Sequence, residues 1–213
     1  MNSLIIGIVA NEQIINNKSY EAIVRNNLKY LNNKCSYIGI IMYDFNGHFD
    51  TNILDNCDGI IFQGGTNIYP YHFEILNYCL NNNIPVFGIC MGMQIMGLYA
   101  NKQLEEDLIK IDNHYNTSHN INIDKNSVLF NLFGDNMLVN SRHNYMLEYV
   151  DSPFIIGSRS DDGVIESIEL IDNDHFILGL QFHPEDMDNM DKLYNYFIKE
   201  CLKRKNIREL KKN

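Results

Sequence analysis

A cysteine between two glycines is the residue of this chain best suited to nucleophilic chemistry. Cys90 lies in the segment Gly88-Ile89-Cys90-Met91-Gly92, directly after an apolar run at residues 84–87. A sharp turn from a strand to a helix holds such a side chain clear of the backbone and tolerates only small flanking residues. The N-terminus of the helix that follows favours the thiolate, the reactive form of cysteine. The motif therefore predicts a reactive thiol.

A second motif supplies a base and a group to orient it. Downstream the chain reads Gln181-Phe182-His183-Pro184-Glu185, again after an apolar run. Residues two apart on an extended chain point the same way, so Glu185 can hold one ring nitrogen of His183 while the other faces Cys90. The alternative is a buried structural cysteine and an unrelated turn histidine. The order of the two motifs, each after a predicted strand, favours a Cys-His-Glu triad for acyl transfer.

The elements that must position these residues alternate along the first half of the chain. Strands are predicted at residues 4–10, 37–43, 56–62 and 84–89, and helices at residues 20–31, 73–82 and 91–100. This alternation is typical of a doubly wound, mainly parallel sheet with flanking helices, in which sites form at the carboxyl ends of the strands.

From residue 111 the pattern changes to short β-like segments separated by turns. We expect antiparallel or mixed strands, added at the edge of the sheet, at residues 120–123, 136–139, 154–158, 164–170 and 177–181. A closing helix is expected at residues 191–202. The length of 213 residues fits one α/β domain spanning residues 1–213.

Composition excludes several classes of function. The net charge of −10 argues against a nucleic-acid surface. The chain shows no membrane-length apolar run and no signal-peptide pattern, so a cytoplasmic protein is expected. The five cysteines lack zinc-binding spacing, and the interval between His114 and His119 does not suggest a metal site. We therefore expect no metal and no organic cofactor.

The end of the chain carries a charge opposite to the rest. Residues 199–213 hold seven basic and two acidic side chains, a net charge of +5, which leaves −15 on the remainder. One interpretation is a solvated helix end that frays, where basic residues suit the helix dipole. The other is a docking tail for an anionic partner.

The two motifs resemble those of the class I glutamine amidotransferase-like family, which comprises triad-type glutaminases and their γ-glutamyl hydrolase relatives. The resemblance extends from residue 4 to about residue 197. Members break a γ-glutamyl amide through a cysteine thioester. The resemblance implies that Cys90 is the nucleophile, His183 the acid and base, and Glu185 the residue that orients the histidine.

The same resemblance implies an oxyanion hole and a contact for the glutamyl group. The Gly64-Gly65 turn follows a predicted strand, and the backbone N–H groups of Gly65 and Met91 are the expected donors. Gln94 lies one helical turn after Cys90 on the same face. In the family a glutamine here touches the γ-glutamyl group, whereas the alternative is a glutamine that faces solvent.

The segment from Val139 to His143 resembles the Val-Asn-Ser-x-His segment of the hydrolase branch, which faces the glutamyl moiety. On a regular strand Ser141 and His143 share one face, and Asn140 and Arg142 share the other. We expect Ser141 and His143 to face the pocket. Arg142 is an obvious carboxylate or phosphate partner, but it reaches the pocket only if the strand ends there.

The loop at residues 63–70 also resembles the hydrolase branch, but other positions depart from it. Met91 replaces an arginine, residues 71–74 lack the usual Arg-Asp, and the loop is short. These departures count against γ-glutamyl-aminobutyrate and folate substrates. The compact, asparagine-rich chain is similar to hydrolases that release cytidine diphosphoramidate from its γ-glutamyl conjugate in capsule phosphoramidate synthesis.

The expected substrate is thus a small γ-glutamyl conjugate, in the narrowest form a nucleotide-linked one. Its phosphates would need Arg142, Arg25 or Lys18 in an otherwise acidic chain. A monomer or a homodimer is expected. The main alternative is a glutaminase subunit that supplies ammonia to a synthetase partner, and a regulatory protein of the same fold is a third possibility.

Overall fold

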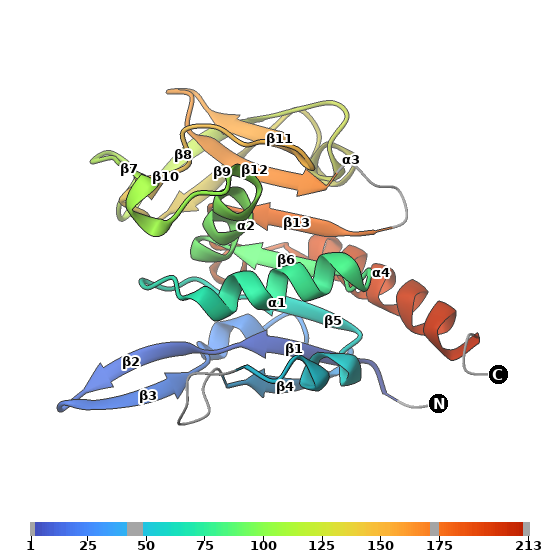
Figure 1. Ribbon diagram of the computed structural model, residues 1–213. Coiled ribbons are helices and arrows are strands. Elements are labelled where there is room, and N and C mark those ends of the chain that lie inside the picture. Colours follow the sequence, from blue (N-terminus) through green and yellow to red (C-terminus); the bar gives the residue numbers. More distant parts are fainter. Residues whose placement is uncertain (1–2, 42–48, 171–174, 211–213) are drawn as a thin grey trace.

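The computed structural model describes residues 3–41, 49–170 and 175–210, and these build a nine-stranded mixed sheet (Figure 1). Five neighbouring strands are parallel, in the order β4 (Ser36–Ile40), β1 (Ile5–Val9), β5 (Gly59–Phe62), β6 (Val86–Ile89) and β13 (Ile177–Leu180). The sheet continues with antiparallel strands β12 (Ile165–Leu170), β11 (Phe154–Ser160), β8 (Thr117–Ile123) and β9 (Asn136–Ser141). The predicted fold class is confirmed.

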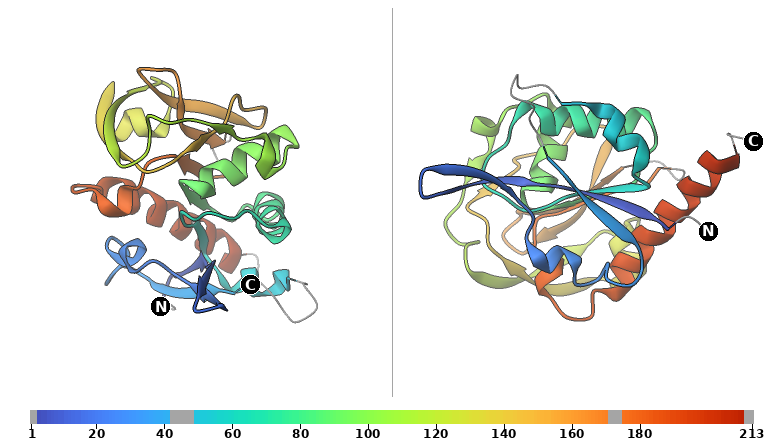
Figure 2. Two further views of the ribbon diagram at one scale, coloured as in Figure 1. Left: turned by 90° about the vertical axis from the view of Figure 1, so that its left-hand side faces the viewer. Right: turned by 90° about the horizontal axis from the view of Figure 1, so that it is seen from below.

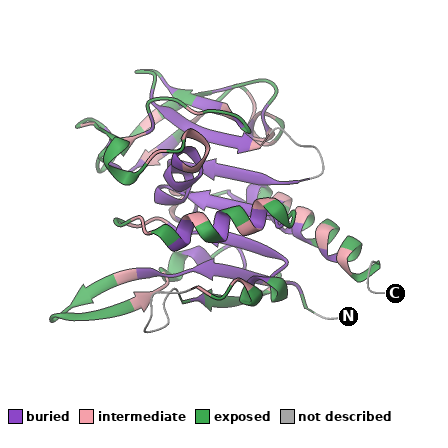
Figure 3. Ribbon diagram, in the orientation of Figure 1, coloured by how far each residue is buried: buried purple, intermediate pink, exposed green. Residues whose placement is uncertain are grey.

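Helices cover both faces of this sheet (Figure 2). Helices α1 (Pro70–Asn81) and α2 (Met91–Asn101) lie on one face, and α3 (Val128–Phe133) and α4 (Asp191–Leu210) on the other. Side chains of β5 alternate between the two cores, because Ile60 and Phe62 pack toward α1 and α2 while Ile61 packs toward α4. The central strands are therefore buried on both sides (Figure 3), as in other doubly wound sheets.

Shorter elements complete the described structure. The hairpin of β2 (Asn11–Ile15) and β3 (Lys18–Ala22) projects from the carboxyl end of β1, and β7 (Ile109–Lys110) pairs with β10 (Tyr145–Met146). Four 3₁₀ helices span Arg25–Leu28, Thr51–Asn56, Glu105–Asp107 and Pro184–Asp186. No helix among the described residues is both long enough and apolar enough to cross a membrane.

Strand β13 differs from its expected place. Residues 177–181 were predicted among the added edge strands, but β13 lies inside the sheet between β6 and β12. It pairs in parallel with β6, with Leu180 opposite Ile89. Its continuous apolar sequence suits this interior position, where both faces are covered. The parallel pairing places the residues after β6 and after β13 at the same edge of the sheet.

The predicted helix at residues 20–31 is wrong. This segment instead holds β3 and the 3₁₀ helix Arg25–Leu28. The side chain of Gln63, after β5, fixes the backbone here, since its amide nitrogen donates to Ala22 O at 2.9 Å and its oxygen accepts from Val24 N at 2.9 Å. These tertiary hydrogen bonds override the weak helical periodicity.

The basic end of the chain belongs to a helix that makes ion pairs with the body of the protein. Helix α4 continues from Asp191 to Leu210, and residues 211–213 lie outside the described residues. Arg208 pairs with the fully buried carboxylate of Asp58 at 2.6 Å, and Lys205 lies 3.5 Å from the same group. Part of the positive charge thus neutralises a buried acid within the chain. The predicted strand at residues 37–43 is β4 as far as Ile40, and residues 42–43 are not described.

Candidate active site

Cys90 occupies a strained turn between β6 and α2. Its backbone has φ 51° and ψ −105°, a conformation that costs a residue with a side chain roughly 1–3 kcal/mol and that concentrates at functional sites. The flanking glycines are required by close packing. A Cβ on Gly88 would lie 2.8 Å from the backbone of Gly92, and one on Gly92 would lie 2.5 Å from the carbonyl oxygen of Phe62. The predicted nucleophile turn is therefore present.

His183 and Glu185 lie beside this turn, in the loop that follows β13. The Nδ1 atom of His183 is 2.7 Å from Oε1 of Glu185, and Glu185 is buried. Asn140 holds the histidine backbone on both sides, because its Oδ1 accepts from His183 N at 2.8 Å and its Nδ2 donates to His183 O at 2.9 Å. The sheet thus brings the three predicted triad residues together, although their catalytic roles stay predictions.

The electrostatics of the pair favour a charged histidine. Burial lowers the pKa of His183, but hydrogen bonds to Cys90 and Glu185 outweigh it and raise the pKa to about 10. The imidazolium is therefore the expected form of His183 at neutral pH. Such a pair can both attack a carbonyl carbon and protonate a leaving nitrogen.

The Gly64-Gly65 turn follows β5, the strand adjacent to β6, and faces the cysteine. A Cβ on Gly64 would lie 2.7 Å from the ring of His183 and 3.4 Å from Cβ of Cys90. Asn11 covers the other side of the turn, with its Nδ2 2.5 Å from Gly64 O. Gly65 lines the cavity at Cys90, as does Met91 in the first turn of α2, where N–H groups lack acceptors within the helix. This arrangement suits the predicted oxyanion hole.

Two glutamines connect the thiol to the cavity wall. Gln181 is fully buried, and its Nε2 lies 3.6 Å from Sγ of Cys90. Gln94 donates to Oε1 of Gln181 at 3.2 Å and to the carbonyl oxygen of Tyr145 at 3.0 Å. Gln94 therefore faces the site rather than solvent. Sequence reasoning missed Gln181, although its position two residues before His183 places both side chains on one face of an extended chain.

A cavity of about 570 Å³ opens at the thiol. Predicted residues that line it are Gly65, Cys90, Met91, Gln94, Arg142 and His143. The acidic residues Glu105 and Glu106 line it as well, and neither carried a sequence signal, because they lie in a short 3₁₀ helix outside every motif. Of the other two cations proposed for a phosphate, Lys18 lies in β3 and Arg25 lines a separate hollow.

The segment after Asn140 is oriented differently from the expectation. Ser141 is fully buried, and its hydroxyl donates to the carbonyl oxygen of His114 at 2.5 Å, away from the cavity. Asn140 and Arg142 instead face the loop that follows β13, where Asn140 contacts the backbone of His183 and Arg142 pairs with Asp186. Strand β9 ends at Ser141, so alternation stops there and Arg142 and His143 both reach the cavity.

Comparison with known proteins shows the family to which the chain belongs. Residues 71–185, more than half of the chain, match the Peptidase C26 family, and the chain belongs to that family. Protein NtpR of Enterococcus hirae is 29% identical over 182 residues, which are 69% of this chain and 76% of that protein. The gamma-glutamyl-gamma-aminobutyrate hydrolase PuuD of Escherichia coli K12 is 26% identical over 168 residues, 62% of this chain and 66% of that protein.

The fold also matches that of solved glutamine amidotransferases. The CTPS glutaminase domain of Trypanosoma brucei superposes with a TM-score of 0.69 at 17% identity, over 94% of each chain. At this identity the likeness concerns the fold alone. Hydrolases and glutaminases thus both occur among the similar proteins.

Proposed function

We propose that this chain is a cysteine-dependent hydrolase that cleaves the γ-glutamyl amide bond of a small molecule and releases glutamate. The observation that carries the proposal is the strained Cys90 turn, with the His183–Glu185 pair beside it and a cavity open to the thiol. Membership of the Peptidase C26 family and the similarity to a gamma-glutamyl-gamma-aminobutyrate hydrolase support it.

The reaction follows from the geometry in two steps. The Cys90 thiolate attacks the γ-carbonyl carbon, and the N–H groups of Gly65 and Met91 stabilise the oxyanion. The His183 imidazolium gives its proton to the leaving nitrogen, the C–N bond breaks, and an amine departs from a γ-glutamyl thioester. Neutral His183 then takes a proton from water, which attacks the thioester. Breaking the C–S bond releases glutamate and restores the thiolate and the imidazolium.

Charges around the cavity favour a particular orientation of the substrate. A γ-glutamyl group carries an α-carboxylate and an α-ammonium. Arg142 suits the carboxylate, and Glu105 or Glu106 suits the ammonium. Gln94 lines the same cavity. We therefore place the glutamyl half of the substrate among these side chains in the cavity.

The same charges bear on the leaving group. A cytidine diphosphoramidate needs cations for two phosphates. Arg142 is the only lysine or arginine among the described residues that line the cavity, and the orientation above already assigns it to the α-carboxylate. Two glutamates on the same cavity repel a further anion. The cavity therefore favours a neutral or cationic amine as the leaving group over a nucleotide.

A specific observation keeps the glutaminase subunit as a second candidate. Leu104, Tyr115 and Tyr145 are exposed large side chains, two of them lining the cavity at Cys90. Exposed apolar groups at the mouth of a site are typical of an interface. A synthetase docked here would receive the ammonia released from glutamine.

A substrate panel separates these candidates. The isolated chain is assayed for glutamate release from γ-glutamyl amines, from γ-glutamyl cytidine diphosphoramidate and from glutamine, with Cys90→Ala as the blank. We expect kcat/KM for a γ-glutamyl amine to exceed that for glutamine by at least about 100-fold, the scale on which a missing substrate contact discriminates. Glutamine as the best substrate would replace the hydrolase with the ammonia-supplying subunit. Preference for the nucleotide conjugate would overturn only the leaving-group argument.

A further inference from the structure

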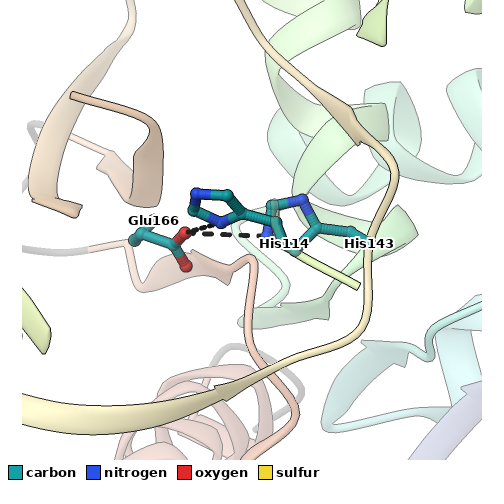
Figure 4. A group of neighbouring side chains, drawn as sticks. All are labelled: His114, His143 and Glu166. Atoms are coloured by element: carbon teal, nitrogen blue, oxygen red, sulfur yellow. Dashed lines mark ion pairs between the residues drawn. The ribbon is translucent and has the colours of Figure 1, made fainter. Parts of the chain in front are cut away.

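Three histidines and a glutamate gather in the interior beside the catalytic cavity. His114 precedes β8, His119 lies in β8, His143 follows β9, and Glu166 lies in β12. The Oε1 atom of Glu166 is 3.3 Å from His114 Nδ1, 3.0 Å from His119 Nε2 and 3.6 Å from His143 Nε2. His114, His143 and Glu166 are almost completely buried, and their side chains converge on one another (Figure 4).

In two of these rings, the nitrogen that faces away from Glu166 (the outer nitrogen) already has a hydrogen-bond partner, and the nitrogen near Glu166 is the inner one. His143 Nδ1 lies 3.0 Å from the carbonyl oxygen of Tyr145, and His114 Nε2 lies 3.0 Å from a carboxylate oxygen of Asp162. Both partners are acceptors, because one is a backbone carbonyl and the other is a carboxylate. Each outer nitrogen therefore carries the proton. In the neutral form of either ring, the inner nitrogen would present a lone pair toward the Glu166 carboxylate.

Hydrogen bonding within the group does not satisfy these atoms. Among the described residues, the inner nitrogens of the three histidines and both oxygens of Glu166 have no hydrogen-bond partner, despite their short separations. The ring N–H directions, were these nitrogens protonated, would not point at the carboxylate. A buried carboxylate that faces lone pairs is unfavourable unless a cation lies between them.

The spacing fits a metal ion. The candidate ligand atoms of His114, His143 and Glu166 lie within 4.8 Å of one another. In a tetrahedral zinc site with bonds of about 2.0–2.1 Å, neighbouring ligand atoms are about 3.3 Å apart. The contacts of His114 and His143 with Glu166, at 3.3 and 3.6 Å, match this separation. A divalent cation would also balance the two negative charges of Glu166 and Asp162.

We propose that His114 Nδ1, His143 Nε2 and Glu166 bind a zinc ion, with His119 as a neighbour whose Nε2 lies 3.0 Å from Glu166 Oε1. Imidazole and carboxylate ligands without a thiolate suit zinc. Asp162 and the carbonyl of Tyr145 orient the two rings from outside, which is the usual role of second partners of metal-bound histidines. The spacing of histidines along the sequence does not reveal this site, because its ligands come from separate segments of the chain.

The position of the site indicates its role. The Tyr145 carbonyl accepts from His143 Nδ1 and from Gln94 Nε2, both at 3.0 Å, and Gln94 and His143 line the catalytic cavity. The ion would fasten the segment at residues 142–145 to β12 and so hold one wall of that cavity. It takes no part in the chemistry at Cys90. Its loss is expected to raise KM for the substrate more than it lowers kcat.

Metal content tests the proposal directly. The full chain is purified through a tag without histidines, and its zinc is measured by mass spectrometry before and after chelation and zinc re-addition. We expect about one zinc per chain and a melting temperature that falls on chelation and recovers with zinc. Glu166→Gln should weaken zinc binding at least about 10-fold. The matched control is Glu169→Gln, a buried glutamate on the same strand that accepts from Val128 N, and it should bind zinc normally.

Cobalt keeps the test decisive if Glu166→Gln does not fold. Cobalt added to the chelated wild-type chain should give the intense visible bands of a tetrahedral nitrogen and oxygen site, and zinc should abolish them. Substoichiometric zinc after re-addition with no change in melting temperature, or no cobalt spectrum, would overturn the proposal and leave a cluster of charged imidazoles and carboxylates. None of these readouts depends on hydrolysis, so the zinc site and the proposed activity can fail separately.

Discussion

Replacing Glu185 with glutamine should lower the pH at which the enzyme loses activity. The carboxylate is buried and lies 2.7 Å from His183 Nδ1. At an effective dielectric constant of 20 the attraction is about 6 kcal/mol. Desolvation of the two groups offsets much of it, so a partner charge at this distance typically shifts a pKa by about 1–3 units, or about 1.4–4 kcal/mol.

The direction of the change follows from the protonation state that acylation needs. Imidazolium must be present to protonate the leaving nitrogen. With the His183 pKa at about 10, kcat/KM of the wild type should decline only above pH 10 or so. The raised pKa of His183 also adds to the stability of the folded protein. This contribution is complete below the unfolded pKa of about 6.5 and is lost as the pH rises through 10. In Glu185→Gln the alkaline limb should move to about pH 7–9.

The assay is the pH profile of kcat/KM with a γ-glutamyl amine, accompanied by NMR titration of labelled histidine. Glu169→Gln serves as the control, because it removes a buried carboxylate that contacts Val128 N. A folded Glu185→Gln variant whose alkaline limb coincides with that of the wild type would refute the reasoning. A loss of turnover as complete as that of Cys90→Ala would show that Glu185 does more than orient and charge the histidine.

The remaining predictions concern the nucleophile, the turn and the basic helix. Cys90→Ala should abolish turnover yet bind substrate in calorimetry, and iodoacetamide should label only Cys90 in intact-mass analysis, because burial raises the pKa of the other four thiols. Equal labelling of Cys90→Ala would contradict this. Gly92→Ala should lower the free energy of unfolding by about 1–3 kcal/mol in urea, because its Cβ would lie 2.5 Å from the backbone oxygen of Phe62; an unchanged midpoint would argue against that packing. Arg208→Ala should lower it by about 1–3 kcal/mol through loss of the pairing with buried Asp58, and a neutral effect would mean that α4 frays in solution.

The sequence alone determined the parts of this protein that depend on local geometry. The glycines at 88 and 92 indicate a crowded turn, since only a residue without a side chain fits there, and the structure has that turn. The apolar runs indicate buried strands, and their alternation with helices specifies a doubly wound sheet. The spacing of His183 and Glu185 is short enough for the extended chain itself to set their relation.

Only the tertiary structure decided the relations between distant segments. The insertion of β13 beside β6 joins His183 to Cys90, and no local pattern specifies the order of strands in a sheet. From the alternation of side chains along a strand, either face of the segment after Val139 could point into the cavity. The end of β9 at Ser141 decided which side chains reach it. The interval between His114 and His119 did not suggest a metal site, because His143 and Glu166, which complete the cluster, are remote along the chain.

The same distinction explains the basic end of the chain. Charge counting favoured a fraying helix end and kept a docking tail as the alternative, because both present positive side chains to water. Folding buries Asp58 under α4, and a buried carboxylate must be paired. Arg208 and Lys205 reach it because the helix crosses that end of the sheet, a position set by packing. Sequence thus determines which groups can ionise or react, and the packing of distant elements determines which of them meet.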